Sequence, residues 1–274
     1  MARNANLVVR SYRYIRQRGI VSFLEAAKRY TVALLYTVYW AFRFGVDLEP
    51  GWLAATSSER RIFEDLFANL RVDDVFYDVG ADEGLFTCPV ASTLETGRVV
   101  AFEPGSGAKR LERRLQEAGL EATIVEKAVS HRGSEGYNAH EGRVGFLGDT
   151  DAPDFEVTNA REILDGGELP LPTVVKIDVY GAETDVTEGL KEILARDECR
   201  LVYLELHLPM AFQQRKRPDD IFEAFLEEWS LTDVVQVLLQ CGFEVEPIYM
   251  RNDTNDLFIR ASKPRRRVSN GPLS

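Results

Sequence analysis

The feature that most constrains this chain is an alternation of short β-like runs with helical runs, which starts near residue 74 and continues almost to the C-terminus. The pattern predicts strands at 75–79, 99–102, 123–129, 174–178, 201–206, 243–249 and 257–259. It predicts helices at 85–94, 109–117, 183–195 and 219–241, the last with a break near Ser230. Strands that are joined through helices form right-handed crossovers and parallel sheets. We therefore expect an α/β protein with a doubly wound, mostly parallel, seven-stranded Rossmann-like sheet, whose last two strands are antiparallel.

Charge divides the chain into three parts, which we predict to be a basic and aromatic helical arm at 1–55, an α/β domain at 56–262 and a disordered basic tail at 263–274. Residues 1–29 carry a net charge of +6 and residues 263–274 carry +4. Because the whole chain has a net charge of −11, residues 30–262 carry −21. An acidic body repels phosphate backbones, which excludes a nucleic acid as substrate. The three cysteines form no CxxC pair, and we expect buried thiols in a reducing compartment.

The arm contains thirteen uncharged residues between Arg29 and Arg43. A helix needs about 20 apolar residues to cross a bilayer, so this run does not cross alone. It begins too late for a signal peptide, and we expect a cytoplasmic protein. Two readings stay open: a helix packed on the domain or on a second subunit, and an interfacial helix through which residues 1–45 contact a membrane peripherally. After the arm, a capping box at 56–59 predicts the start of a further helix.

Acidic residues stand at four of the predicted strand ends, namely at Asp78, Glu103, Asp178 and Glu205, the last followed by His207. In open α/β sheets, ligands bind beyond the carboxyl ends of the strands, at the point where the strand order reverses. Four acids at such positions exceed what packing requires. The sequence therefore predicts a ligand site at this edge of the sheet.

The first strand is followed by a glycine-containing loop over residues 78–84. Gly80 and Gly84 let the backbone turn sharply and approach a ligand. The spacing is G-x-x-x-G, which lacks the third glycine of a dinucleotide loop and disfavours a nicotinamide oxidoreductase. The loop acids would repel a pyrophosphate but suit a ligand with an ammonium and a sulfonium, such as S-adenosylmethionine. Glu103 follows Asp78 by 25 residues, a separation at which an acid accepts both ribose hydroxyls.

Five segments in this order resemble the FkbM family of methyltransferases: YDVGADEG at 77–84, AFEP at 101–104, AVS at 128–130, KIDVYGAE at 176–183 and LELH at 204–207. The resemblance covers roughly residues 60–260. It implies a class I methyltransferase fold and methyl transfer to oxygen, often on sugars or other hydroxylated metabolites. It also implies S-adenosylmethionine as the cofactor, bound by Asp78, Gly80, Ala81, Gly84, Glu103, Pro104, Ala128 and Val129. The chain departs from the family at 82–83, where Asn-Ile is usual, and at Tyr180, where Glu is common. The second departure leaves open a catalytically inactive protein that binds or acts as a scaffold.

Methyl transfer to a hydroxyl needs an acceptor oxygen in line with the methyl group and a group that removes the proton. His207 lies at a strand end and is the best candidate, while His131 and His140 are expected at the surface. Asp178 could orient the acceptor, bind the cofactor's ammonium, or join Glu205 and His207 around a divalent ion such as Mg²⁺. Glu183 either acts in the site or only begins a helix.

The acceptor is expected to be a small molecule or a glycan. Residues 134–167 are predicted to form a hairpin and loop over its pocket, in which Arg143, Phe146 and the run 149–151 could contact it. The basic residues 215–217 could bind an anionic acceptor or form a charged loop. The sequence leaves the oligomeric state undetermined.

Overall fold

The computed structural model describes residues 60–131, 156–179, 181–208, 230–251 and 256–264, together with single positions of a helix between residues 19 and 43. The chain divides into two compact units, Met1–Arg60 and Arg61–Ser274. Within the described residues, every helix is too short or too polar to span a membrane.

The larger unit is built on a seven-stranded sheet with the strand order β3-β2-β1-β6-β7-β9-β8. The strands are β1 (Val75–Val79), β2 (Arg98–Phe102), β3 (Thr123–Val125), β6 (Val174–Asp178), β7 (Leu201–His207), β8 (Glu244–Arg251) and β9 (Asp256–Ser262). The first five are parallel, and β9 runs antiparallel to both β7 and β8. This order confirms the doubly wound, mostly parallel seven-stranded sheet and places its switch point between β1 and β6.

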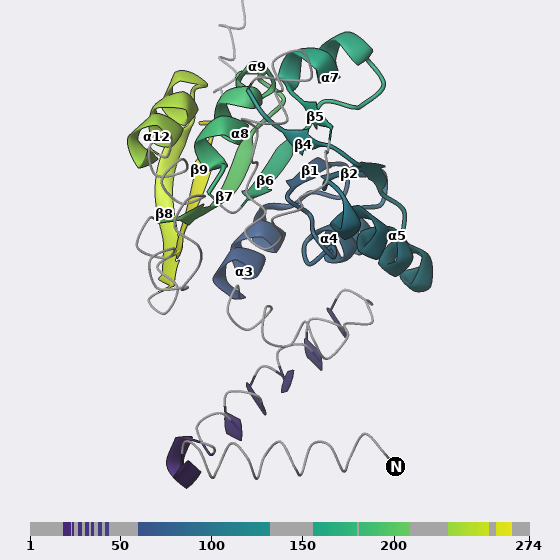
Figure 1. Ribbon diagram of the computed structural model, residues 1–274, viewed down its shortest axis with the longest axis vertical. Helices are drawn as coiled ribbons and strands as arrows, with labels where there is room; N and C mark the ends of the chain where they lie inside the picture. Colours follow the sequence, from purple (N-terminus) through teal and green to yellow (C-terminus); the bar gives the residue numbers. More distant parts are fainter. Residues whose placement is uncertain are drawn as a thin grey trace, which may run out of the picture. The chain divides into compact units, whose positions relative to one another are not determined.

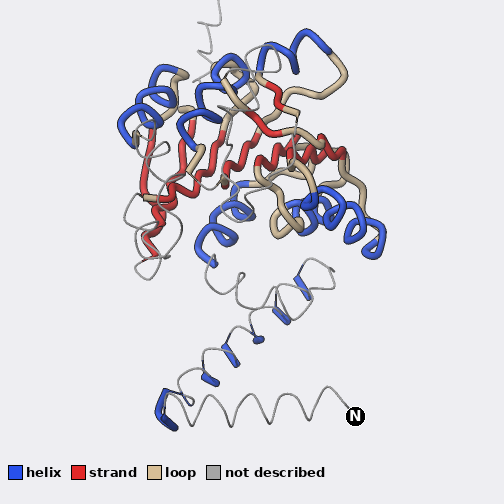
Figure 2. Tube along the Cα trace, in the orientation of Figure 1, coloured by secondary structure: helices blue, strands red, loops and turns tan. Residues whose placement is uncertain are grey.

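Helices cover both faces of the sheet (Figures 1 and 2). One layer holds α3 (Arg60–Asn69), α4 (Thr87–Thr93) and α5 (Ser106–Ala118), and the other holds α8 (Glu183–Gly189), α9 (Lys191–Leu194) and α12 (Leu231–Gln240). All seven residues of β7 are buried, as expected for a strand packed on both sides. The buried thiols predicted for Cys88, Cys199 and Cys241 are confirmed.

The prediction of one strand over 123–129 was wrong. The segment forms β3 and then β4 (Ala128–Val129), which pairs in parallel with β5 (Val157–Thr158) in a separate two-stranded sheet. The chain turns between them because the Lys127 amide donates to the Val125 carbonyl at 2.7 Å. The Ala128 amide then donates to the Glu156 carbonyl at 2.9 Å, which starts the second sheet.

The predicted helix over 183–195 is two helices. Leu190 lies between α8 and α9 with φ −96° and ψ 0°, outside the helical region. Gly189 packs against the backbone after β4, where an added Cβ would lie 2.7 Å from the carbonyl carbon of Ser130. Close approach of these backbones fixes the end of α8.

The loop predicted over 134–167 is wrong at its C-terminal end, which forms β5 and α7 (Ala160–Gly166). Asn159 begins α7, because its Oδ1 accepts a hydrogen bond from the Glu162 amide at 3.0 Å. An Asn followed three residues later by Glu is a helix-start signal that could have found this helix. The rest of the predicted hairpin lies outside the described residues.

The break predicted near Ser230 can be compared with the structure. The described part of the last helix begins at Leu231, after Ser230, whose hydroxyl accepts from the Asp233 amide at 3.2 Å. The N-terminal half of that prediction and the capping box at 56–59 lie outside the described residues.

Candidate active site

The loop after β1 lies against the end of β6 at the switch point. Gly80 and Gly84 have φ values of +79° and +86°, which favour glycine. An added Cβ at Gly80 would lie 2.0 Å from the carbonyl oxygen of Asp178. The Gly80 amide also donates to the Phe102 carbonyl of β2 at 2.9 Å. The loop therefore joins the ends of β2 and β6, and Ala81 within it is buried.

Glu103 is buried beyond the end of β2, with 2% of its surface exposed. Its Oε2 accepts a hydrogen bond from the Asp82 amide at 2.8 Å. Its Oε1 is also buried and has no hydrogen-bond partner in the part of the chain that the structure describes. Gly107 in α5 leaves room for this carboxylate, since a Cβ there would lie 2.2 Å from Oε1. Burial raises the pKa of Glu103 to about 7.

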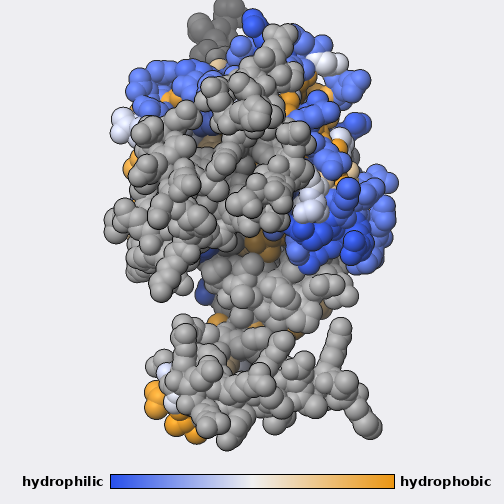
Figure 3. Space-filling view, in the orientation of Figure 1, coloured by the Kyte–Doolittle hydropathy of each residue, from blue (hydrophilic) through white to orange (hydrophobic). Residues whose placement is uncertain are grey.

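Asp82 and Glu83, which the sequence placed beside a cationic ligand, are paired with arginines of α5. Arg110 lies 2.7 Å from Asp82 and 3.2 Å from Glu83, and Arg114 lies 3.0 Å from Glu83. Hydrophilic residues gather over α5 on the surface (Figure 3). The charge of these two loop acids is therefore balanced within the protein.

Asp78 is buried at the end of β1 and accepts a hydrogen bond from the Thr87 hydroxyl at 2.6 Å. Lys176 Nζ lies 3.6 Å from Asp78 Oδ1, 3.1 Å from Asp178 Oδ2 and 4.4 Å from the centre of the Phe86 ring. Burial raises the pKa of Asp78. Burial also acts to raise the pKa of Asp178, but the combined effect of Lys176, His207 and a hydrogen bond from Glu205 is larger, and the pKa is lowered. Lys176 was not predicted as a site residue, although it begins the KIDVYGAE segment and this position was a signal for it.

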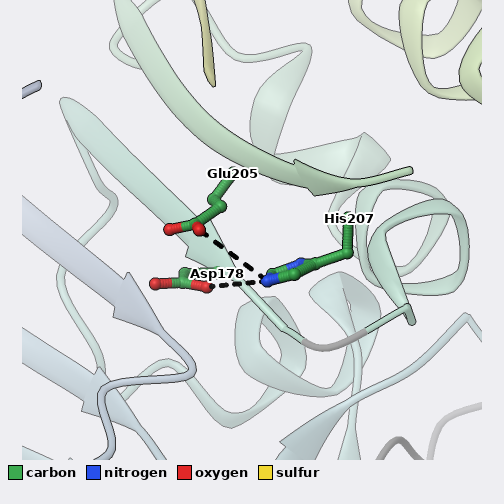
Figure 4. A group of neighbouring side chains, drawn as sticks. All are labelled: Asp178, Glu205 and His207. Atoms are coloured by element: carbon green, nitrogen blue, oxygen red, sulfur yellow. Dashed lines mark ion pairs between the residues drawn. The ribbon is translucent and has the colours of Figure 1, made fainter. Parts of the chain in front are cut away.

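Asp178, Glu205 and His207 come from the ends of β6 and β7 and point toward one another (Figure 4). His207 Nε2 lies 4.0 Å from Asp178 Oδ1 and 3.8 Å from Glu205 Oε1. On the other side of the ring, Nδ1 lies 2.7 Å from Glu183 Oε1, and the His207 amide donates to the same oxygen at 3.3 Å. Burial acts to lower the pKa of His207, but the hydrogen bond and charge of Glu183, together with the charges of Asp178 and Asp256, outweigh it and the pKa is raised.

Arg251 at the end of β8 completes this group. Its Nη1 lies 3.3 Å from Glu205 Oε1 and 3.1 Å from Oδ2 of the buried Asp256. Neither Arg251 nor Asp256 was predicted from the sequence as a site residue. The site therefore has a loop side, around Glu103, and a β6–β7 side, around His207.

The remaining candidates are placed as follows. Pro104 is buried directly after Glu103, and Ala128 and Val129 are buried in β4. His131 is exposed and pairs with Asp185 through Nδ1. The remaining positions lie outside the described residues: Tyr180, His140, the candidate acceptor contacts Arg143, Phe146 and 149–151, and the basic residues 215–217.

Comparison with known proteins gives one family and several relatives. The Methyltransferase FkbM domain model matches residues 78–245. A hexuronic acid methyltransferase, AglP of Haloferax volcanii, is 28% identical over 177 residues, which are 61% of this chain and 71% of that protein. AMB antimetabolite synthetase AmbE of Pseudomonas aeruginosa is 27% identical over 218 residues, which cover 59% of this chain but only 10% of AmbE. Among solved structures, methyltransferase FkbM from Methylobacillus flagellatus has a TM-score of 0.47 at 14% identity, covering 88% of this chain and 60% of that one.

Proposed function

The chain belongs to the FkbM methyltransferase family, and on this premise we propose that it transfers a methyl group from S-adenosylmethionine to a hydroxyl oxygen of a sugar, a glycan or another small hydroxylated metabolite. The observation that carries the proposal is Glu103, a buried carboxylate beyond β2 with one oxygen that has no partner among the described residues. A buried acceptor of this kind is costly unless a donor reaches it. The two hydroxyls of a ribose are such donors.

The cofactor is proposed to lie along the loop after β1. Asp78, Gly80, Ala81 and Gly84 form its floor, Glu103 and Pro104 hold the ribose, and Ala128 and Val129 border the base. The buried carboxylate of Asp78 is shared with Lys176, so Glu103 is the better candidate for direct contact with the cofactor. Asp82 and Glu83 contribute less, because the α5 arginines neutralise them.

The chemistry is an in-line displacement. The bond between the sulfonium and its methyl breaks, its electron pair stays on sulfur, an oxygen–methyl bond forms, and the acceptor hydroxyl loses its proton. His207 and Asp178 are proposed to act on the acceptor, because they meet at the ends of neighbouring strands near the loop. Glu183 is proposed as a positioning residue, since it fixes the imidazole of His207 from behind.

A sugar acceptor is supported by the hexuronic acid named for AglP. Incubation with methyl-labelled S-adenosylmethionine and glycans that contain hexuronic acids tests it, with mass spectrometry for an added O-methyl group and for S-adenosylhomocysteine. Product formation excludes a non-catalytic scaffold. Calorimetry that detects no heat with S-adenosylmethionine or S-adenosylhomocysteine, on folded protein, would contradict the proposal as a whole.

Residues 1–45 of the arm are proposed to contact membranes peripherally. The catalytic domain is proposed to comprise residues 56–262 and the basic tail residues 263–274. Of the exposed large hydrophobic residues among the described positions, nine lie in the arm: Ile20, Val21, Leu24, Val32, Leu34, Leu35, Val38, Tyr39 and Phe42. These positions recur at helical spacing, and the arm begins with a basic segment. An apolar helix face next to basic residues is typical of interfacial helices.

A further inference from the structure

Asp178, Glu205 and His207 point toward one another at distances that suit a shared ion (Figure 4). The distances from His207 Nε2 to the two carboxylates, 4.0 and 3.8 Å, exceed hydrogen-bond length. One ligand atom from each residue lies within 4.8 Å of the others. Two ligands that each lie about 2.0–2.6 Å from one ion are separated by about 3–5 Å. The spacing is therefore that of atoms around a shared cation.

The ring of His207 is also oriented in the way that is usual for a histidine that binds a metal. Its Nδ1 is tied to Glu183, which is fully buried, and this leaves Nε2 directed toward both carboxylates (Figure 4). Histidines that bind metals usually donate their other ring nitrogen to a carboxylate, which fixes the tautomer and orients the ring. Asp178 keeps 21% of its side chain exposed, so an ion could enter from its side.

Charge points the same way. Within the described residues, the ion pairs that join this group connect five carboxylates to two permanent cations, Lys176 and Arg251. The carboxylates are Asp78, Asp178, Glu183, Glu205 and Asp256. This part of the site is therefore rich in carboxylate oxygens, which are the ligands that a hard divalent cation prefers.

Arg251 does not block this site. It contacts Glu205 Oε1, the oxygen that also faces His207, at 3.3 Å. A carboxylate offers about four lone-pair positions and can accept from both an arginine and an ion. Lys176 contacts Oδ2 of Asp178, whereas Oδ1 faces His207. Each carboxylate that would hold the ion is therefore also contacted by a permanent cation.

We propose that Asp178, Glu205 and His207 bind one divalent cation, Mn²⁺ or Mg²⁺, which holds the oxygen of the acceptor. Two carboxylates favour these ions over softer ones, and one imidazole is compatible with Mn²⁺. A hydroxyl bound to such an ion loses its proton more readily, which is the change that methyl transfer needs. This inference rests on the proposed function only for its role, since binding of the ion is independent of the methyl donor.

The test is a titration of the full-length protein with Mn²⁺ alone, in which the electron paramagnetic resonance signal of the free ion measures how much Mn²⁺ is bound. We expect one Mn²⁺ per chain, with a Kd below about 1 mM, displaced by excess Mg²⁺. Asp178→Asn and Glu205→Gln should weaken binding at least about tenfold, and Glu183→Gln about tenfold through the orientation of His207. Asp233→Asn removes an exposed carboxylate of α12 outside the group and should leave binding unchanged.

Wild-type protein that binds no Mn²⁺ at concentrations up to about 1 mM would overturn the inference, whatever the variants do. So would binding that Asp178→Asn and Glu205→Gln, each confirmed as folded by circular dichroism, leave intact. Methyl transfer in the presence of EDTA, without bound metal, would leave the proposed function standing and make His207 the base. Binding of Mn²⁺ without methyl transfer to any acceptor would contradict the function and leave the ion site standing.

Discussion

Replacing Glu103 by glutamine separates its role in cofactor binding from its effect on stability. The side chain keeps its shape and can still accept the Asp82 amide, but it loses the negative charge that would receive the ribose hydroxyls. Hydrogen bonds to a charged group contribute about 1.5–3 kcal/mol. Because one oxygen is already used by Asp82, we expect a loss of about 2–3 kcal/mol. This corresponds to binding of S-adenosylmethionine that is weaker by about 30- to 150-fold.

The same substitution should stabilise the protein without cofactor. The pKa of Glu103 is raised by burial from its ordinary value of 4.5 to about 7, so the native state holds the proton where the unfolded chain has lost it. Stability therefore falls as the pH rises from about 4.5 to about 7, and the loss is complete above that range. Glu103→Gln removes this loss, and its unfolding temperature at pH 8 should exceed that of the wild type.

Calorimetry with S-adenosylmethionine and S-adenosylhomocysteine at pH 8, together with thermal unfolding of the free protein at pH 5 and pH 8, measures both effects. The matched control is Glu83→Gln, which removes a carboxylate of the same loop that is already paired with arginines and should change the Kd by less than about threefold. An unchanged Kd in Glu103→Gln would refute the ribose assignment. A variant that is less stable at pH 8 would refute the account of the buried charge.

Three further predictions follow from the site and the arm. His207→Ala should lower methyl transfer by about 10²- to 10⁴-fold with an unchanged Kd for S-adenosylmethionine, and a loss of cofactor binding would instead indicate a structural role. Gly80→Ala should cost at least about 3 kcal/mol of unfolding free energy, because its positive φ disfavours alanine and the added Cβ also meets the Asp178 carbonyl at 2.0 Å, whereas Gly119→Ala, at a φ of +64° but with open space around it, should cost only about 1–2 kcal/mol. Full-length protein should co-sediment with anionic vesicles and protein lacking residues 1–45 should not; equal behaviour of the two removes the membrane contact.

Most of the sheet could be predicted because its central strands are buried on both faces and read as continuous apolar runs. The acids at their ends were found for the same reason, since a strand that ends in Asp178 or Glu205 places that side chain at a known edge. The points at which a predicted strand or helix is divided into two elements were not predicted. Nothing in the apolar pattern of 123–129 marks the turn at Lys127, which depends on pairing with the distant β5.

Arg251 shows why the partners of these acids could not be predicted. It comes from the edge hairpin of β8 and β9, whose register shifts between Pro247 and Tyr249. A shift of one residue reverses which face each following side chain occupies. The contact of Arg251 with Glu205 therefore depends on an irregularity that alternation along β8 does not reveal.

The pairing of Asp82 and Glu83 with α5 has a consequence for how this protein can vary through evolution. If Asp82 and Glu83 were replaced by the uncharged Asn-Ile that is usual in the family, Arg110 and Arg114 would lose the carboxylates with which they pair beside the proposed cofactor loop. The local potential would then oppose a positively charged methyl donor. Loop and helix are thus expected to mutate as a coupled set, with acids at 82–83 tolerated only in lineages that keep arginines one and two turns into α5.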